Sequence, residues 1–163
     1  EDDLERALRL TYTNSDGRGM ANAIEKSGSG LNPNKGADAK FLEGMEEFEE
    51  LPNWLTQEDI DYFVSQFEKS GLRGPLNRYR AQNIDWEELS ILPEQIEQPA
   101  FFITGSLDPV NFFVPSQQSL TERIKSNYKN LMVVKELEGI GHWTKQEAPE
   151  KVNSIILSFL NDL

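Results

Sequence analysis

The most regular pattern of apolar and polar positions lies between residues 56 and 71. Apolar side chains recur there at the spacing that places them on one face of an α-helix, at positions Ile60, Phe63, Val64 and Phe67. Thr56 is suited to cap the start of this helix, with Asp59 three residues on in a near capping box. Gly71 follows as a helix-ending glycine would. The pattern therefore predicts a helix that begins after Thr56 and ends before Gly71.

Weaker patterns surround that helix in the first part of the chain. The segment DLERALRLTY (3–12) has leucines near helical spacing, and TNSDGRG (13–19) interrupts it. Residues 26–40 are rich in Gly, Ser, Asn and Pro, which predicts a mobile surface loop. Pro75 is suited to open a further helix, and a short helix is expected around Trp86. We expect the tryptophans of this part, Trp54 and Trp86, and also Tyr12, to be packing contacts.

The pattern changes near residue 90, and strands appear after residue 95. PAFFITG (99–105) is a continuous apolar run typical of a strand buried on both faces, and LMVVKEL (131–137) predicts a second strand. Residues 116–127 and 148–163 predict helices. Their expected inward positions are Leu120 and Ile124 in the first helix, and Val152, Ile155, Ile156, Phe159 and Leu160 in the second. Strand, helix, strand, helix predicts an α/β unit with parallel strands.

Two residues with catalytic potential follow the two predicted strands. Asp108 lies a few residues beyond the first strand, and His142, the single histidine of the chain, lies beyond the second. Ligands of open α/β sheets bind beyond the carboxyl ends of strands, and adjacent parallel strands would bring these loops together. A carboxylate that accepts from one imidazole nitrogen leaves the other free as a base. Acid before histidine is also the chain order of α/β-hydrolases. The alternative is a coincidental meeting of two loop residues.

Composition narrows the possible functions. The chain of 163 residues is 37% hydrophobic and 27% charged, which is ordinary for a globular protein, and it lacks a segment apolar enough to span a membrane. A net charge of −12 makes nucleic acid a poor candidate partner. The absence of cysteine rules out a disulfide framework and a thiolate metal site, and a single histidine makes zinc improbable. These features fit a cytoplasmic protein.

Several motifs resemble a known family. GSLDPV (105–110), GIGHW (139–143) and KQEAPEKVN (145–153) look like the end of an α/β-hydrolase, and residues 54–80, which include GPLNRYR, look like the lid of the soluble epoxide hydrolases. The resemblance implies an α/β fold that comprises the C-terminal portion of an α/β-hydrolase. Residues 1–90 would form a helical lid, and residues 91–163 would form the last two parallel core strands with their helices.

The resemblance also implies a chemistry. In this family an aspartate attacks the epoxide to form an alkyl-enzyme ester, and water activated by histidine hydrolyses the ester to a vicinal diol. The resemblance makes His142 the base and Asp108 the residue that orients it, while Tyr79 in the lid donates to the epoxide oxygen. Val110 and Trp143 match positions that line the substrate pocket. The reaction needs an epoxide and water, with no cofactor and no metal.

The aspartate nucleophile is not in this sequence. The family carries it on a Gly-x-Asp-x-Gly turn before the lid, and no such stretch occurs in residues 1–163. A second lid tyrosine is expected upstream as well. We therefore expect the 163 residues alone to be unstable and inactive, and to require an N-terminal half of the same enzyme. Two buried parallel strands also need neighbouring strands at their edges.

Other readings remain open because the nucleophile lies outside the sequence. A serine at that position would make the protein an esterase or lipase with the same Asp108 and His142. An aspartate combined with halide-binding lid groups would indicate a dehalogenase, although GPLNRYR argues against it. A hydrolase-fold protein that binds a ligand without turnover is the alternative outside enzymes.

Overall fold

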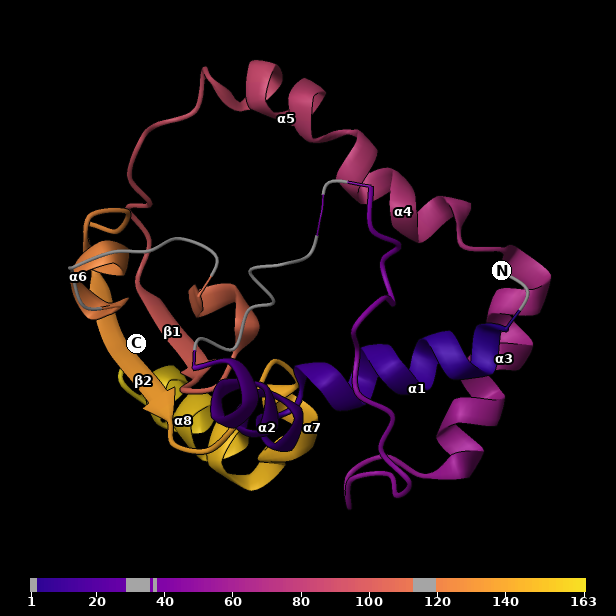
Figure 1. Cartoon of the computed structure of the whole chain (residues 1–163). Coiled ribbons are helices and arrows are strands. Elements are labelled where there is room, and N and C mark those ends of the chain that lie inside the picture. The colour runs from indigo at the N-terminus through magenta and orange to yellow at the C-terminus, as the bar shows by residue number, and fades with distance from the viewer. Residues whose placement is uncertain (1–2, 29–35, 37, 113–119) are drawn as a thin grey trace.

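The structure is a computed structural model that describes residues 3–28, 36, 38–112 and 120–163 (Figure 1). The elements in chain order are α1 (Leu4–Ser15), α2 (Gly17–Ser27), α3 (Gln57–Ser70), α4 (Arg73–Arg80), α5 (Gln82–Leu89), β1 (Ala100–Gly105), the 3-10 helix η1 (Pro109–Phe112), α6 (Leu120–Lys125), β2 (Leu131–Leu137), α7 (Thr144–Glu147) and α8 (Pro149–Asn161). In Figure 1 the chain passes from α3 through α4 and α5 around the upper side of the view and returns to β1.

Helix α3 forms as its sequence predicts. The backbone N–H of Asp59 donates to the Thr56 hydroxyl at 3.1 Å, and the N–H of Thr56 donates to the Asp59 carboxylate at 2.9 Å, so the capping box is complete. Hydrogen bonds from the side chain and backbone of Thr56 lower the pKa of the Asp59 carboxyl. Ile60 is fully buried, and Gly71 ends the helix with a φ of 66°. Local signals therefore define both ends of this element.

The first part of the chain contains one more helix than the sequence predicts. Asp16 ends α1 and caps α2 in a single residue, because its side chain accepts from the N–H of Gly19 at 2.6 Å. The interruption at TNSDGRG is therefore a bend between two helices. The predicted loop over 26–40 is wrong at its start, since α2 continues to Ser27 and ends at Gly28, where φ is 76°. Much of that loop, residues 29–35 and 37, lies outside the described residues.

Strands β1 and β2 pair in parallel, with Ile103 opposite Lys135 and Gly105 opposite Leu137. Helix α8 packs on one face of the pair, where the rings of Phe101 and Phe159 lie 4.7 Å apart. A small core joins the end of β2 to α7 and α8, made of Leu137, Ala148 and Val152 with Ile103, Ile140, Ile155 and Ile156 around it. The parallel α/β unit is confirmed.

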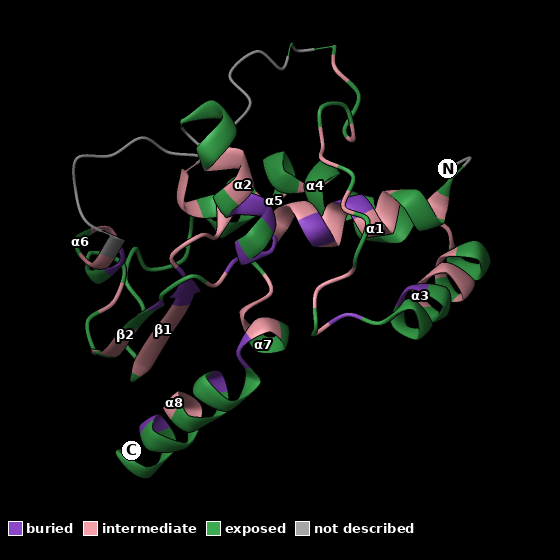
Figure 2. Cartoon of the chain, turned by 60° about the horizontal axis from the view of Figure 1, so that its bottom comes forward, coloured by how far each residue is buried: buried purple, intermediate pink, exposed green. Residues whose placement is uncertain are grey.

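Some burial predictions are wrong for this chain. Strand β1 is fully buried only at Thr104 and Gly105, because the described sheet has two strands and little covers the rest. Leu160 of α8 is 55% exposed and Trp86 of α5 is 82% exposed. Figure 2 shows buried residues at the end of β1 and where α1 meets α2, and others on α3 and α8. Of the predicted inward residues, Ile124, Val152 and Phe159 are buried, and Ile155 and Ile156 are half-buried.

The segment that contains Leu120 is described only in part. Helix α6 begins at Leu120, within the predicted helix over 116–127, and residues 113–119 lie outside the described part. Within the described residues, none of the helices is both long and apolar enough to cross a membrane.

Candidate active site

Asp108 stands in a tight turn directly after β1. The strand ends at Gly105, and the N–H of Asp108 donates back to the Gly105 carbonyl at 3.1 Å before η1 begins. The Asp108 carboxylate atom Oδ1 accepts from the N–H of Val110 at 3.0 Å. Asn111 ties the turn to the strand, because its amide donates to the Gly105 carbonyl at 3.0 Å. The carboxylate is therefore fixed at the end of the strand, with its side chain 14% exposed.

The loop that carries His142 lies against this turn. The N–H of Ser106 donates to the carbonyl of Leu137 at 2.9 Å, and the N–H of Leu107 donates to that of Ile140 at 2.9 Å. The Ser106 hydroxyl also accepts from the N–H of Gly139 at 2.9 Å. Parallel pairing of the strands thus continues as hydrogen bonds between the loops that follow them. This is the proximity that the sequence predicts.

The two side chains meet directly. His142 Nδ1 lies 3.0 Å from Asp108 Oδ1. When Asp108 is ionised its oxygen is an acceptor, so Nδ1 carries the proton and Nε2 carries the lone pair. Within the part of the chain that the structure describes, no group hydrogen bonds to Nε2, and the His142 side chain is 41% exposed. The arrangement can therefore accept a proton at Nε2 and stabilise the resulting imidazolium through the carboxylate.

Glycines allow the close approach of backbone segments around this pair. A Cβ on Gly105 would lie 2.1 Å from the carbonyl oxygen of Ile140, and one on Gly141 would lie 2.4 Å from the nitrogen of Gly17. Gly139 has a φ of 73°, which side-chain-bearing residues rarely adopt. The end of β1, the histidine loop and the α1–α2 junction therefore touch backbone to backbone.

The α1–α2 junction supports the histidine loop through polar contacts. The N–H of His142 donates to the carbonyl of Ser15 at 2.8 Å. Glu147 of α7 accepts from the N–H of Gly17 and from the N–H of Gly141, both at 2.9 Å. Asp16 in the same junction is 1% exposed, and its burial raises the pKa of its carboxyl, although the N–H of Gly19 opposes that shift.

The predicted pocket-lining residues are close neighbours of the pair in the sequence, Val110 two residues after Asp108 and Trp143 next to His142. Val110 is 48% exposed in η1. The Trp143 indole N–H donates to the carbonyl of Tyr12 at 2.9 Å, and the two rings lie 4.6 Å apart. Tyr12 also contacts Phe63 and Trp54, so the packing role predicted for Tyr12 and Trp54 is confirmed. A pocket-lining role for Val110 and Trp143 stays a prediction.

Tyr79 is not brought to the histidine in this chain. It lies on α4, where the residue is 68% exposed, and it makes no hydrogen bond to Asp108 or His142. Figure 1 shows α4 across the molecule from the two strands. Its role as a proton donor to the epoxide oxygen stays a prediction.

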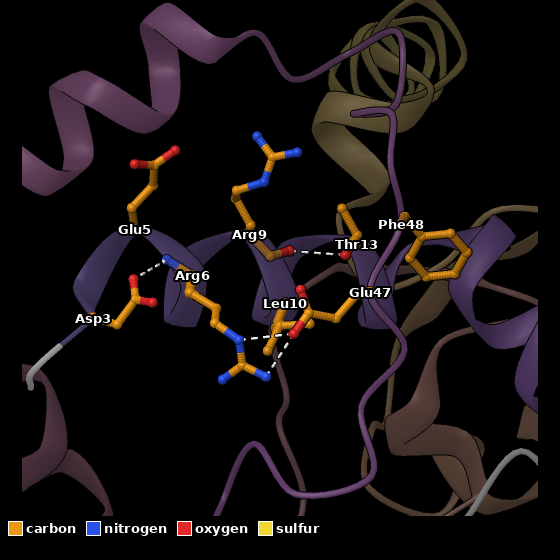
Figure 3. A pocket seen from close by; sticks show the side chains of 8 residues that line it. All are labelled: Asp3, Glu5, Arg6, Arg9, Leu10, Thr13, Glu47 and Phe48. Carbon is orange, nitrogen blue, oxygen red and sulfur yellow. Dashed lines mark hydrogen bonds and ion pairs between the residues drawn. The ribbon is translucent and has the colours of Figure 1, made fainter.

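A cavity elsewhere on the chain does not include the pair. About 260 Å³ in volume, it lies along α1 between charged side chains, several of which are already paired (Figure 3). Arg6 donates to Glu47 at 2.8 Å, and Arg9 donates to Gln57 at 2.8 Å. Its lining residues are Asp3, Glu5, Arg6, Arg9, Leu10, Thr13, Glu47 and Phe48. The geometry of Asp108 and His142 thus remains the better candidate for chemistry.

Comparison with known proteins places this chain in a class and a family. Epoxide hydrolase A of Mycobacterium tuberculosis is 34% identical over 124 residues, which are 76% of this chain and 37% of that protein. Epoxide hydrolase 1 of Siraitia grosvenorii is 38% identical over 114 residues, covering 69% of this chain and 36% of that protein. The crystal structure of epoxide hydrolase A from Mycobacterium thermoresistibile superimposes with a TM-score of 0.78 at 30% identity, over 98% of this chain and 46% of that one. No protein-family model matches.

The helices and two parallel strands are those of the C-terminal portion of an α/β-hydrolase fold. Within that class, the family to which the chain is homologous is that of the epoxide hydrolases. The chain spans less than half the length of these relatives.

Sequence reasoning missed Glu147, Asp16 and the α1–α2 junction as parts of this site. The sequence does contain a signal for Glu147. It is a carboxylate that follows His142 by five residues and precedes Pro149 by two, which places it within reach of the histidine loop. Nothing in the local sequence of Gly17 indicates its contact with Glu147, since 130 residues separate the two.

Proposed function

We propose that this chain supplies the base, its orienting acid and the lid of an epoxide hydrolase. The observation that carries the proposal is the hydrogen-bonded pair of Asp108 and His142 at 3.0 Å, located beyond parallel strands in a homologue of epoxide hydrolases. Water is the second substrate. No metal or organic cofactor has a role in this chemistry.

The proposed reaction has two steps. First, a carboxylate oxygen of an upstream aspartate attacks an epoxide carbon, the carbon–oxygen bond of the ring breaks, and the Tyr79 phenol gives its proton to the released alkoxide. An alkoxide is far more basic than a phenolate, so the transfer is favourable. Second, Nε2 of His142 takes a proton from water, and the hydroxide attacks the ester carbonyl. Collapse of that intermediate releases the diol and restores the aspartate, while the imidazolium proton passes back to the phenolate through solvent.

We further propose that residues 1–90 form the lid and residues 91–163 form the C-terminal part of the hydrolase core. The partner of both is an N-terminal half that carries the nucleophile. Exposed apolar side chains support the need for this partner, because Trp86, Ile91 and Leu160 are large, apolar and exposed. Both outer edges of the described two-stranded sheet would also gain neighbours. The acidic chain without cysteine suits the cytoplasm.

The proposal is tested by comparing the 163-residue chain with the same chain joined to its N-terminal half. The intact mass under denaturing conditions is measured first, since the chain alone has a mass of 18.6 kDa. We expect epoxide turnover from the complete protein and none from the 18.6 kDa species, because the latter lacks the nucleophile. Turnover of epoxides by the short species would contradict the proposal, and turnover of esters without epoxides would favour the esterase alternative.

Replacement of Tyr79 by phenylalanine should slow ring opening and leave ester hydrolysis intact. A positioned general acid contributes about 10²–10⁴-fold to the rate. A second lid tyrosine is expected to donate to the same oxygen, so we expect the rate of ring opening to fall about 10²-fold. The measurement is the single-turnover rate of ester formation in the complete protein. Tyr62→Phe is the matched control, because Tyr62 is an exposed lid tyrosine on α3. An equal rate for Tyr79→Phe and wild type would remove Tyr79 from the mechanism.

A further inference from the structure

One carboxylate receives three backbone N–H groups beside the histidine. Glu147 Oε2 accepts from Gly17 and from Gly141, both at 2.9 Å, and Oε1 accepts from Trp143 at 3.0 Å. Gly141 and Trp143 are the immediate neighbours of His142 in the chain. The third donor, Gly17, is the first residue of α2. Glu147 thus joins both sides of the histidine to a helix far away in the sequence.

Every backbone N–H from residue 141 to 143 is thereby occupied. Glu147 binds those of Gly141 and Trp143, and the Ser15 carbonyl accepts that of His142 at 2.8 Å. Hydrogen bonds from N–H groups to a carboxylate are charge-assisted and stronger than those between neutral groups. The start of α2 adds favourable partial positive charge at Gly17. The backbone that carries the imidazole ring is therefore held on both sides and at its centre.

We propose that Glu147 is a positioning residue for His142, and this rests on the function proposed above. The hydrogen bonds of the carboxylate go to backbone N–H groups and not to the ring. They fix the loop backbone so that Nδ1 stays 3.0 Å from Asp108, which leaves Nε2 to act as the base in the proposed ester hydrolysis. An amide cannot replace it, because a glutamine offers one oxygen acceptor and puts an NH₂ donor against one of the three N–H groups.

The test uses Glu147→Gln in the complete protein and measures both half-reactions in single turnovers. We expect ester formation to change less than about twofold, because His142 takes no part in it. Ester hydrolysis should fall about 10–100-fold, since misplacement of a reacting group by about 1 Å can cost 10²-fold. The matched control is Glu150→Gln, which removes the same charge from an exposed position three residues away. We expect wild-type rate constants from it.

A second readout does not depend on turnover. In histidine-labelled protein, the NMR signals of His142 are assigned by their loss in His142→Gln and then titrated. We expect Glu147→Gln to shift the His142 titration and Glu150→Gln to leave it unchanged. The titration tests the positioning role of Glu147 even if the wild-type protein does not open epoxides. A lack of epoxide turnover would count against the proposed function alone.

Several results would overturn the proposal. A wild-type hydrolysis rate constant in Glu147→Gln, together with an unshifted His142 titration, would show that the loop needs no carboxylate. Equal losses in the two half-reactions would indicate general damage to the fold. The amplitude of ester formation gives the number of folded sites. The first-order rate constant of ester hydrolysis does not depend on that number, so it remains measurable in a partly folded sample. Should Glu147→Gln not fold, Glu147→Asp keeps the charge but shortens the reach, and the same selective loss is expected.

Discussion

Replacement of His142 by glutamine should trap the reaction at the ester. In the proposed mechanism, ring opening requires the upstream aspartate and the lid phenol, so the covalent intermediate should still form. Its hydrolysis requires a base at the position of Nε2, and glutamine is not basic at neutral pH. Loss of a general base costs about 10²–10⁴-fold, and we expect steady-state diol formation to fall by that factor. The measurement is the intact mass of the protein after incubation with an epoxide, where a species heavier by the mass of one substrate should accumulate.

The trapped adduct also identifies the nucleophile. Peptide mapping should locate it on an aspartate outside residues 1–163, whereas an adduct on serine would support the esterase alternative. Tyr79→Phe provides the contrasting pattern, because slow ring opening prevents accumulation. Diol formation by His142→Gln at the wild-type rate would contradict the assignment of His142 as the base.

Local sequence signals predicted those parts of the molecule that local forces determine. Helix α3 is set by the apolar stripe that includes Ile60 and by the capping box of Thr56 and Asp59, all within a few residues of one another. The meeting of Asp108 and His142 followed from a rule about parallel strands, since residues just beyond the ends of adjacent strands share one edge of the sheet.

The sequence could not predict features that depend on distant or separate partners. Periodicity shows that Leu160 shares a helix face with Ile156, but it does not show whether another element covers that residue. Trp86 is exposed as well, and its local sequence likewise does not show whether another element covers it. The contact of Glu147 with Gly17 depends on how α2 packs against the histidine loop. Helix α2 itself was not predicted, because only one residue, Asp16, separates it from α1.

Replacement of Gly105 by alanine should lower both stability and ester hydrolysis. A Cβ at this position would lie 2.1 Å from the Ile140 carbonyl oxygen and 2.4 Å from that of Gly141. Both atoms belong to backbone, so no flexible side chain can move aside. Overpacking typically costs about 1–3 kcal/mol. The clash can be relieved if the histidine loop moves away from β1. That movement would displace His142 relative to Asp108.

The two effects of Gly105→Ala are measured separately in the complete protein. Denaturant unfolding should show the loss of about 1–3 kcal/mol. Ester hydrolysis should slow by up to about 10²-fold, because the base is displaced from its substrate, while ester formation per folded site stays near the wild-type rate. Gly74→Ala is the matched control, since a Cβ on Gly74 in α4 meets no atom within 4 Å. A Gly105→Ala protein as stable and as active as Gly74→Ala would mean that the close packing of β1 against the histidine loop does not position the base.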